Sequence, residues 1–302
     1  MIIYNNLTKI KKIKKTVIAI GNFDGVHLGH QKVLRQASLK AKENKIKFGI
    51  VTFEPVPVMF FNKKIKNHRI NSLKQKIDRF KKLKIDYLFI IKFNKKFSNL
   101  SYKQFIEKII YKKFNSKYIF VSKNFRFGKN REGNIQKLKL DEKKFSYKTF
   151  VSSPFKISNK VLSSSIIRSE IKKGNITKAN KFLGRKWCVE GKVIKGQKRG
   201  RKIGFPTCNI NLNNYVLPRL GVYAVKVMIN KIIRKGIANV GYRPTFNQKT
   251  LLLEVNIFGL KSNLYNKIIK VSFLKFIRPE KKFKNVKQLI KQIKLDIKKS
   301  KK

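Results

Sequence analysis

The chain has 302 residues, which is enough for two domains, and its 42% hydrophobic residues, with 24 Phe, argue against a disordered protein. The 75 Lys and Arg residues outnumber the 14 Asp and Glu residues to give a formal net charge of +61, but the lysines are spread along the whole chain, so we expect only weak, non-specific binding of polyanions. Two cysteines, no apolar run near ~18 residues and an N-terminus without a signal-peptide core argue against disulfides, membrane spans and secretion, and predict a cytoplasmic protein.

The first half of the chain alternates strand-like and helix-like segments. Short β-branched or aromatic runs predict strands at 16–20, 47–53, 87–93 and 117–122. Stretches compatible with helices lie between them, at about 29–43, 72–83 and 101–113. This alternation predicts an α/β domain, in which helices cover the faces of a parallel sheet.

The second half contains strand-like runs without helices between them. These runs lie at 187–194, 221–229, 235–240, 250–258 and 268–277. Turn residues separate them, and this pattern predicts an antiparallel barrel or sandwich. Apolar residues at helical spacing predict a C-terminal helix at about 285–299. Because the pattern changes near residues 180–186, we predict two domains, 1–183 and 184–302, and expect the second to fold alone.

The segment GNFDGVHLGH, residues 21–30, collects two of the chain's three histidines and three glycines directly after the first predicted strand. In a parallel sheet, ligands bind beyond the carboxyl ends of the strands. His27 and His30 are three residues apart, so both can face one side of a helix that begins near Leu28. The N-terminus of such a helix attracts phosphate. The alternative is a strand-to-helix turn whose histidines lie on the surface or in the core.

This decapeptide resembles the HxGH signature of the nucleotidyltransferase superfamily, in the version found in bacterial bifunctional riboflavin kinase/FAD synthetases. Further landmarks follow in the family's order: VTFEP (51–55), NFRFG (124–128), SSSIIR (163–168), KIGFPTCNINL (202–212), LPRLGVYAV (217–225), IANVGYRPTF (237–246), LEVNIF (253–258) and LYNKIIKVSFLKFIRPEKKF (264–283). The resemblance implies a Rossmann-like α/β domain of the nucleotidyltransferase type. A mostly antiparallel six-stranded β-barrel with a C-terminal helix would follow it.

By this resemblance, the first domain holds an FMN adenylyltransferase site. His27 and His30 would hold the ATP phosphates as catalytic residues, and Arg168 would join them from SSSIIR. Further nucleotide-binding residues that it implies are Gly21, Phe23, Asp24, Gly25, Gly29, Asn124, Ser164 and Ser165. Phe127 is a candidate for flavin binding. The plain alternatives are a helix start at SSSIIR and a strand-end turn at 124–128, with Phe127 in the core.

The segment GQKRGRKIGFPTCN, residues 196–209, resembles the flap of riboflavin kinases with their PTAN motif. Thr207 and Asn209 alternate on a strand, so both can point to one face, and their oxygen atoms suit Mg²⁺. Cys208 should face the opposite side. The resemblance also makes Gly204 and Pro206 candidates for nucleotide binding.

Phosphorylation of an alcohol needs a base, because the hydroxyl must lose its proton. Glu254, in LEVNIF, matches the family's catalytic Glu, and Arg243 is the implied flavin-binding residue of the kinase site. Without the resemblance, Glu254 would be taken as a solvent-facing strand residue.

The sequence departs from the family at Val56 and Val58, where a His and an Arg are common, and both positions concern the adenylylation site. The favoured interpretation is a bifunctional enzyme that converts riboflavin and ATP to FMN, and FMN and ATP to FAD and pyrophosphate, both with Mg²⁺. One alternative is a riboflavin kinase with weak or lost adenylyltransferase activity. The other is a basic nucleic-acid-binding protein. The sequence indicates no oligomeric state.

Overall fold

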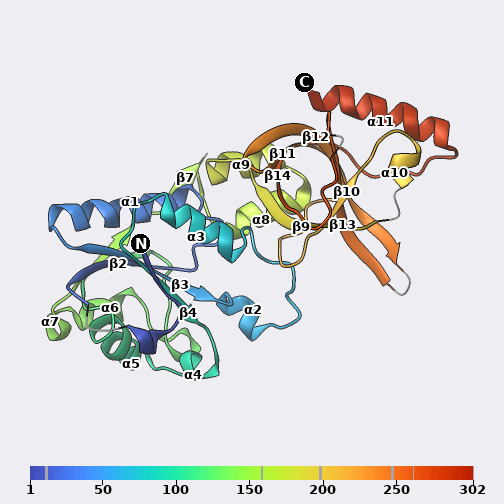
Figure 1. The fold of residues 1–302 in the computed structure, drawn as a ribbon. Helices are drawn as coiled ribbons and strands as arrows, with labels where there is room; N and C mark the ends of the chain where they lie inside the picture. The colour runs from blue at the N-terminus through green and yellow to red at the C-terminus, as the bar shows by residue number, and fades with distance from the viewer. Residues whose placement is uncertain (11–12, 158, 197–198, 246–247, 261, 302) are drawn as a thin grey trace. The chain divides into compact units, whose positions relative to one another are not determined.

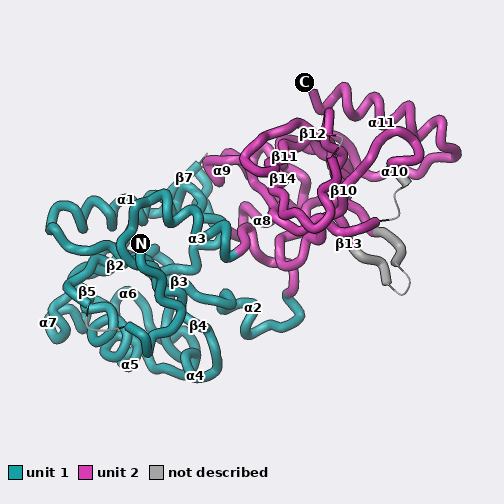
Figure 2. The backbone as a smooth tube through the Cα atoms, viewed as in Figure 1, with its two compact units in different colours: residues 1–65, 73–163 teal, residues 66–72, 164–302 magenta. Residues whose placement is uncertain are grey.

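The computed structural model divides into two compact units (Figure 2). Unit 1 comprises residues 1–65 and 73–163, and unit 2 comprises residues 66–72 and 164–302. The structure describes residues 1–302 except 11–12, 158, 197–198, 246–247, 261 and 302, and it leaves out the side chains of 199 and 243–250 as well. By its contacts, unit 2 includes residues 164–183 and the short segment 66–72 as well as residues 184–302. The division into domains 1–183 and 184–302 stays a prediction.

Unit 1 is built on a six-stranded parallel sheet. Its strands are β1 (Ile2–Tyr4), β2 (Thr16–Ile20), β3 (Lys47–Glu54), β4 (Tyr87–Lys92), β5 (Ser116–Ser122) and β6 (Lys148–Ser152), in the order β1-β4-β3-β2-β5-β6. From β2 the chain goes to β3 and β4 on one side, and later to β5 and β6 on the other. The sheet therefore has its topological switch point between β2 and β5, which is where ligands bind in open α/β sheets.

Helices and short turns surround this sheet (Figure 1). They are η1 (Leu7–Lys9), α1 (Leu28–Glu43), α2 (Pro57–Phe61), α3 (Leu73–Lys81), α4 (Lys95–Ser98), α5 (Tyr102–Gln104), the π-helical η2 (Phe105–Tyr111), η3 (Lys129–Arg131), α6 (Ile135–Leu140) and α7 (Glu142–Phe145), followed by the hairpin β7 (Lys156–Ile157) and β8 (Lys160–Val161).

Alternate residues of the strands feed two separate hydrophobic cores, one on each face of the sheet. Val17 and Ala19 of β2 pack with α1 and α3, whereas Ile18 and Ile20 pack with η2 and the segment around Tyr147. Figure 1 shows α1 and α3 on one face of the sheet and α5 and α6 on the other. Burial on both faces explains why β2 is apolar throughout, as parallel strands usually are.

Unit 2 is a closed antiparallel barrel with helices attached to it. Its strands are β9 (Cys188–Ile194), β10 (Cys208–Asn211), β11 (Gly221–Ile229), β12 (Ile232–Thr245), β13 (Gln248–Ile257) and β14 (Ile268–Arg278), and the closed order is β10-β13-β12-β11-β14-β9. All neighbouring strands are antiparallel. Closure leaves the sheet without free edges, and the interior is filled by apolar side chains such as Val225, Leu253 and Val271.

The helices of unit 2 are α8 (Ser164–Lys173), α9 (Ile176–Leu183), α10 (Arg199–Lys202) and α11 (Val286–Lys301). An ion pair connects α11 to the barrel: Nη2 of Arg278 lies 2.7 Å from Oδ2 of Asp296. Asp296 is only 1% exposed. Nε of Arg278 donates to both oxygens of the same carboxylate, at 2.8 and 3.0 Å. This geometry fixes the C-terminal helix on strand β14.

Helix α9 and the segment 66–72 are bonded to the start of the barrel. The side chain of Asn180 accepts from the backbone N–H of Trp187 at 2.6 Å and donates to the carbonyl of Phe273 at 3.0 Å. The indole N–H of Trp187 donates to the carbonyl of Ile70 at 3.0 Å, and Arg185 donates to the side chain of Asn71 at 2.7 Å. These buried bonds explain why both segments group with unit 2.

The predicted strands and long helices are confirmed, with end points that differ by a few residues. Strands β1 and β6 were not predicted, because they are short and partly exposed at the edges of the sheet. Cys188 and Cys208 are both free thiols, in agreement with the prediction that disulfides play no part. Within the described residues, no helix has the length and apolar character needed to cross a membrane.

Candidate active sites

His27 and His30 lie where the chain leaves β2 and enters α1. His27 is the N-cap of α1, and its Nδ1 accepts a hydrogen bond of 3.3 Å from the backbone N–H of His30. The two imidazoles stack, with ring centroids 3.6 Å apart and 22° between their planes. Because Nδ1 of His27 is an acceptor, the neutral ring carries its proton on Nε2, which is then a donor for an anion.

The loop between β2 and α1 has an unusual backbone. Phe23, Gly25 and Val26 have φ values of 48°, 83° and 40°, in the left-handed region. For the two non-glycine residues this conformation costs about 1–3 kcal/mol each. The N–H of Val26 donates to the carbonyl of Phe23 at 3.1 Å, and the side chain of Gln31 donates to the carbonyl of Val26 at 2.9 Å. Strain of this kind is typical of ligand-binding loops.

Glycines allow the aromatic rings of this loop to pack closely. A Cβ on Gly29 would lie 3.1 Å from Cε1 and 3.2 Å from Nδ1 of His27, so a larger residue would displace the imidazole. A Cβ on Gly21 would lie 3.2 Å from the ring of Phe23, which meets His30 edge-on at 5.3 Å between centroids. Five of the predicted nucleotide-binding residues lie in the same segment as the two histidines: Gly21, Phe23, Asp24, Gly25 and Gly29.

Of the other residues of unit 1 that the sequence singled out, some are exposed and others are buried in the core. Asn124 is exposed in the turn after β5, the strand next to β2, which supports a place at the same switch point. Phe127 is 7% exposed and packs in the core, 5.1 Å from the ring of Phe105, which favours a packing role over flavin binding. Val56 is buried as the N-cap of α2, whereas Val58 is exposed.

Ser164, Ser165 and Arg168 lie in the first turns of α8, in unit 2. Nη2 of Arg168 donates to Oγ of Ser165 at 3.3 Å. The local potential is positive: burial, followed by the charges of Arg168 and Lys172, lowers the pKa of His68 to about 4. Such a potential suits a phosphate group. The part of these residues in adenylyl transfer stays a prediction, because the histidine loop belongs to unit 1.

In unit 2, strand pairing brings Asn209 and Glu254 together. Asn209 of β10 lies directly opposite Glu254 of β13, and Glu254 lies directly opposite Asn239 of β12. Residues that face each other in this way share one face of the sheet. Leu253 and Val255 on either side of Glu254 are 0% and 1% exposed in the barrel interior, so the row Asn209–Glu254–Asn239 lies on the outer face.

Asn209 is the most buried member of that row, at 7% exposed, and its Oδ1 lacks a hydrogen-bond partner among the described residues. A Cβ on Gly196 would overlap the amide nitrogen of Asn209, so a larger residue at 196 would displace the Asn209 side chain. Thr207 directly precedes β10, and strand alternation turns it to the same face. A buried, unsatisfied carbonyl oxygen and a hydroxyl two residues before it in the sequence are ligands that suit a hard cation such as Mg²⁺.

The flap before β10 is a compact turn. Gly204 has a left-handed φ of 85°, and the N–H of Phe205 donates to the carbonyl of Gly200 at 2.8 Å. The carbonyl of Pro206 accepts from Nδ2 of Asn256 at 2.7 Å, so the flap is tied to β13 two residues beyond Glu254. Arg243 belongs to β12, but its side chain lies outside the described residues.

Cys208 faces away from Asn209, as predicted. It is the strand partner of Val255, whose side chain lies in the barrel interior, and its Sγ lies 3.5 Å from the carbonyl of that residue. Burial raises the pKa of the Cys208 thiol to about 11. The thiol is therefore protonated at neutral pH and is a packing group rather than a metal ligand.

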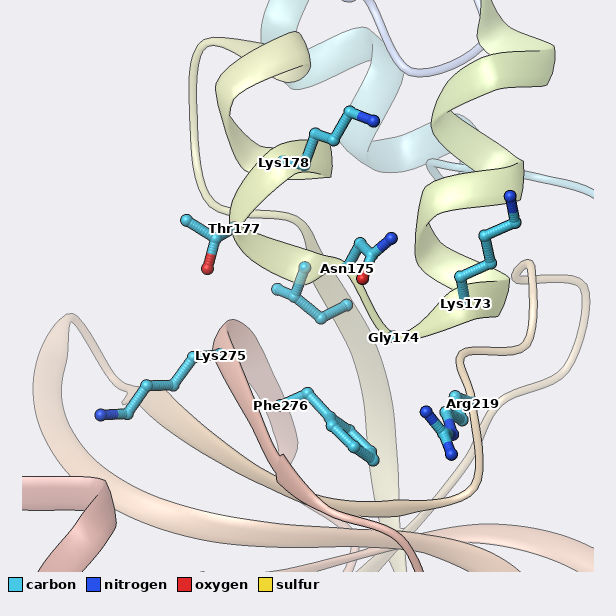
Figure 3. A pocket seen from close by; sticks show the side chains of 9 residues that line it. Lys173, Gly174, Asn175, Thr177, Lys178, Arg219, Lys275 and Phe276 are labelled. Carbon is cyan, nitrogen blue, oxygen red and sulfur yellow. The ribbon is translucent and has the colours of Figure 1, made fainter.

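A hollow of about 540 Å³ lies in unit 2 between the α8–α9 turn and the barrel (Figure 3). The cations that line it are Lys173, Lys178, Arg219 and Lys275. Lys178 is 2.9 Å from the carboxylate of Glu170, and the guanidinium of Arg219 lies over the ring of Phe276 at 5.1 Å. In Figure 3 the three lysine side chains extend away from the hollow, so their charges do not converge on one ligand. We assign no site there.

Sequence reasoning missed three residues that the structure places beside these sites. Asn239 flanks Glu254, and Lys76 and Thr52 contact the histidine loop. Asn239 could have been noticed as a polar residue within the apolar strand run IANV. Lys76 could have been noticed as a lysine on the apolar side of the predicted helix 72–83, next to the similarly buried Gln75.

Comparisons with known proteins agree with this arrangement. The family model for FAD synthetase matches residues 9–166, and that for riboflavin kinase matches residues 183–302. The chain is 40% identical to the bifunctional riboflavin kinase/FMN adenylyltransferase of Buchnera aphidicola subsp. Schizaphis graminum, over 97% of this chain and 95% of that protein. The chain belongs to this family. The resemblance of its motifs to the family is thereby confirmed along nearly its whole length.

More distant bacteria contain similar proteins of the same name. The chain is 39% identical to the protein of Bacillus subtilis and 32% identical to that of Escherichia coli K12, in both cases over 93% of this chain and 90% of the relative. A crystal structure described as a macrolide-efflux protein from Streptococcus pneumoniae has a TM-score of 0.88 and 29% identity, and the match covers 99% of this chain and 98% of that one. We take from this last match only that the fold is shared.

Proposed function

We propose that the chain is a bifunctional enzyme that makes both flavin cofactors. Riboflavin and ATP give FMN and ADP at the barrel site of unit 2, and FMN and ATP give FAD and pyrophosphate with the histidine loop of unit 1. The observation that carries the proposal is the direct pairing of Asn209 with Glu254, since these two come from distant segments of the chain. Family membership of both halves supports both activities.

Glu254 is the proposed base of the kinase reaction. Its carboxylate takes the proton of the riboflavin 5′-hydroxyl, whose oxygen then forms a bond to the γ-phosphorus of ATP while the bond to the β–γ bridging oxygen breaks and ADP leaves. The partly exposed outer face of β13 supports this role, because an alcohol can approach there. Asn239 flanks the carboxylate and donates to Glu280 at 3.1 Å, which keeps the amide in place.

Mg²⁺ fits the residues of the same face. The oxygen atoms of Thr207 and Asn209 would hold it. The observation that supports this fit is the buried Oδ1 of Asn209, which has no hydrogen-bond partner among the residues that the structure describes. When bound, the ion neutralises charge on the transferred phosphoryl group. The glycine at 196 would then leave room for the Asn209 amide in this position.

Adenylyl transfer needs cations and N–H donors rather than a strong base, because the FMN phosphate is already anionic. Its oxygen forms a bond to the α-phosphorus of ATP, the bond to the α–β bridging oxygen breaks, and pyrophosphate leaves. His27 and His30, at the N-terminus of α1, would stabilise the charge that develops on the phosphates.

Flavin chromatography tests the proposal directly. The full-length chain is incubated with riboflavin and MgATP, and the products are separated over time. We expect FMN first and FAD afterwards. FMN alone, with no FAD even when FMN is supplied, would favour the kinase alternative and refute the second activity. A chain that turns over neither flavin would refute both.

The proposal also places the enzyme in the cytoplasm, where ATP and reduced thiols are abundant. The charge of +61 should give weak, salt-sensitive binding of any polyanion rather than a specific nucleic-acid complex. Titration of a random-sequence duplex at two salt concentrations measures this. Nanomolar, sequence-selective binding at physiological salt would revive the nucleic-acid alternative.

A further inference from the structure

Lys76 of α3 is the one lysine among the described residues that is almost fully buried, at 4% exposed. Its ammonium donates to Oγ1 of Thr52 at 2.9 Å and to the backbone carbonyl of Asn22 at 3.2 Å. The hydroxyl of Thr52 donates to the same carbonyl at 3.1 Å. Lys76, Thr52 and Asn22 thus form a closed triangle of hydrogen bonds at the carboxyl end of β2 and β3.

Burial of a lysine ammonium costs free energy, and Lys76 is the one lysine among the described residues that is buried. Lysine side chains usually keep their charged end in water, and the other described lysines of this chain are intermediate or exposed. A charged group is buried only where surrounding atoms satisfy it, and such groups are concentrated at functional sites. The partners of Lys76 include a carbonyl of the histidine loop, at Asn22, and the hydroxyl of the buried Thr52.

Helix α3 holds the next residue of the loop as well. Phe80 lies one turn after Lys76, on the same side of the helix, and meets the ring of Phe23 edge-on at 5.9 Å between centroids. Phe23 in turn meets His30 edge-on at 5.3 Å, and His30 stacks on His27. One face of α3 therefore fixes two consecutive loop residues, Asn22 by hydrogen bonds and Phe23 by packing.

We propose that Lys76 is a positioning residue for adenylyl transfer: its buried ammonium fixes the loop 21–26 and thereby the orientation of His27 and His30. This inference rests on the function proposed above. The loop needs such support because Phe23 and Val26 have left-handed backbones, which persist only where the surroundings hold them. Lys76 acts through Asn22 and Thr52, and it is not assigned a contact with the substrate.

The test uses Lys76→Met and Lys76→Arg in the full-length chain. FAD formation from FMN should fall ~10- to 100-fold in Lys76→Met, mainly in kcat, because small displacements of catalytic groups are costly. Lys76→Arg, which keeps charge and donors, should regain part of the loss. FMN formation by unit 2 is the internal control and should stay at the parental rate. Unchanged FAD formation in Lys76→Met would overturn the proposal.

Thr52→Val and Thr52→Ser form a second pair that changes no charge. Thr52→Val removes the hydroxyl that bonds both Lys76 and Asn22, whereas Thr52→Ser keeps it. We expect slower FAD formation in the first variant and near-parental rates in the second. Equal rates in both would contradict a positioning role, even if Lys76→Met itself failed to fold.

Proton NMR of the imidazoles gives a readout that does not depend on activity. The chain has three histidines, so each ring can be followed. In folded Lys76→Met the His27 and His30 signals should shift, while His68 in unit 2 should not. Unmoved His27 and His30 signals would sink the inference. A parent protein that forms no FAD would instead refute the proposed function, and the NMR comparison would still decide whether Lys76 positions the loop.

Discussion

The histidine site of unit 1 and the carboxylate site of unit 2 are assembled in opposite ways. His27 and His30 come from one short loop after one strand, and the left-handed backbone of that loop sets their orientation. Asn209 and Glu254 come from separate strands with ordinary extended backbone, and only the register of the barrel makes them neighbours. The first site depends on a local conformation, and the second depends on the pairing of strands.

This difference teaches which changes each site tolerates. A substitution in the histidine loop should act directly on the proposed adenylylation site, because the loop itself carries His27 and His30. A one-residue slip of β13 would turn Glu254 into the barrel and Leu253 outwards, so the kinase site needs the whole barrel to be correctly closed. The two activities should therefore fail independently under mutation, and the following variants test that comparison from the largest effect to the smallest.

Glu254→Gln should give the largest loss. Removal of the base should lower FMN formation ~10²–10⁴-fold, because general-base catalysis contributes about that much. FAD formation from supplied FMN should be unchanged, since it uses unit 1. Calorimetry should find MgADP binding nearly intact, because the base acts on the hydroxyl. Undiminished FMN production by this variant would remove Glu254 from the mechanism.

His27→Ala and His30→Ala should have the opposite effect, a loss of FAD formation alone. Each variant should lower FAD formation ~10²–10³-fold, the usual effect of losing one donor to a developing charge. FMN formation should remain at the parental rate, measured in the same chromatographic assay. If both variants still adenylylate FMN normally, the histidine loop is not the site.

Gly196→Ala tests whether Asn209 is a metal ligand, and it changes no group that takes part in the reaction. The added Cβ overlaps the amide nitrogen of Asn209, so the oxygen must move. We expect MgADP affinity to fall ~10- to 100-fold, comparable to the loss of a group that orients a metal ligand. Gly29→Ala in unit 1 is the matched control and should leave MgADP binding at the kinase site unchanged. An unaffected Gly196→Ala variant would argue against Asn209 as a ligand.

Asn180→Ala should change stability rather than chemistry. It removes two buried hydrogen bonds, to Trp187 and Phe273, and leaves their backbone groups unsatisfied, which should lower the free energy of unfolding of unit 2 by about 2–4 kcal/mol. Urea unfolding followed by Trp187 fluorescence measures this, with the exposed Lys181→Ala as control. Fragment 164–302 keeps Asn180 and helix α9, whereas fragment 184–302 lacks both, so the longer fragment should be more stable. Equal stability of the two fragments would favour the boundary at 183.

The sequence alone indicated most of the fold, because apolar periodicity carries that information. Strands such as β2 and β11 are β-branched apolar runs, and helix α1 places its buried residues at helical spacing. The segment 66–72 could not be assigned, since its bonds to unit 2 are largely made by backbone groups, which leave no pattern in the side chains. Edge strands β1 and β6 lack an apolar face long enough to be noticed.

The sites divide in the same way. The histidine loop is contiguous and could be found as a motif, whereas the neighbour relation between Glu254 and Asn239 needs the register of two strands. Lys76 lies on the apolar side of a predicted helix, but its burial and its bonds to Asn22 and Thr52 depend on how α3 packs against the loop. Phe127 was a candidate for flavin binding by its motif, and its place in the core depends on packing that the motif does not encode.

The segment 66–72 should affect how the two units separate after proteolysis. Both of its ends continue into unit 1, while Arg69 exchanges backbone hydrogen bonds with the stretch 214–216 in unit 2, at 2.9 and 2.8 Å. The polypeptide therefore passes between the units at three points: after residues 65, 72 and 163. A protease that cuts after Ser163 gives the pieces 1–163 and 164–302, and segment 66–72 of the first piece stays hydrogen-bonded to the second. The nicked pieces should leave a sizing column together, and only a denaturant should part them.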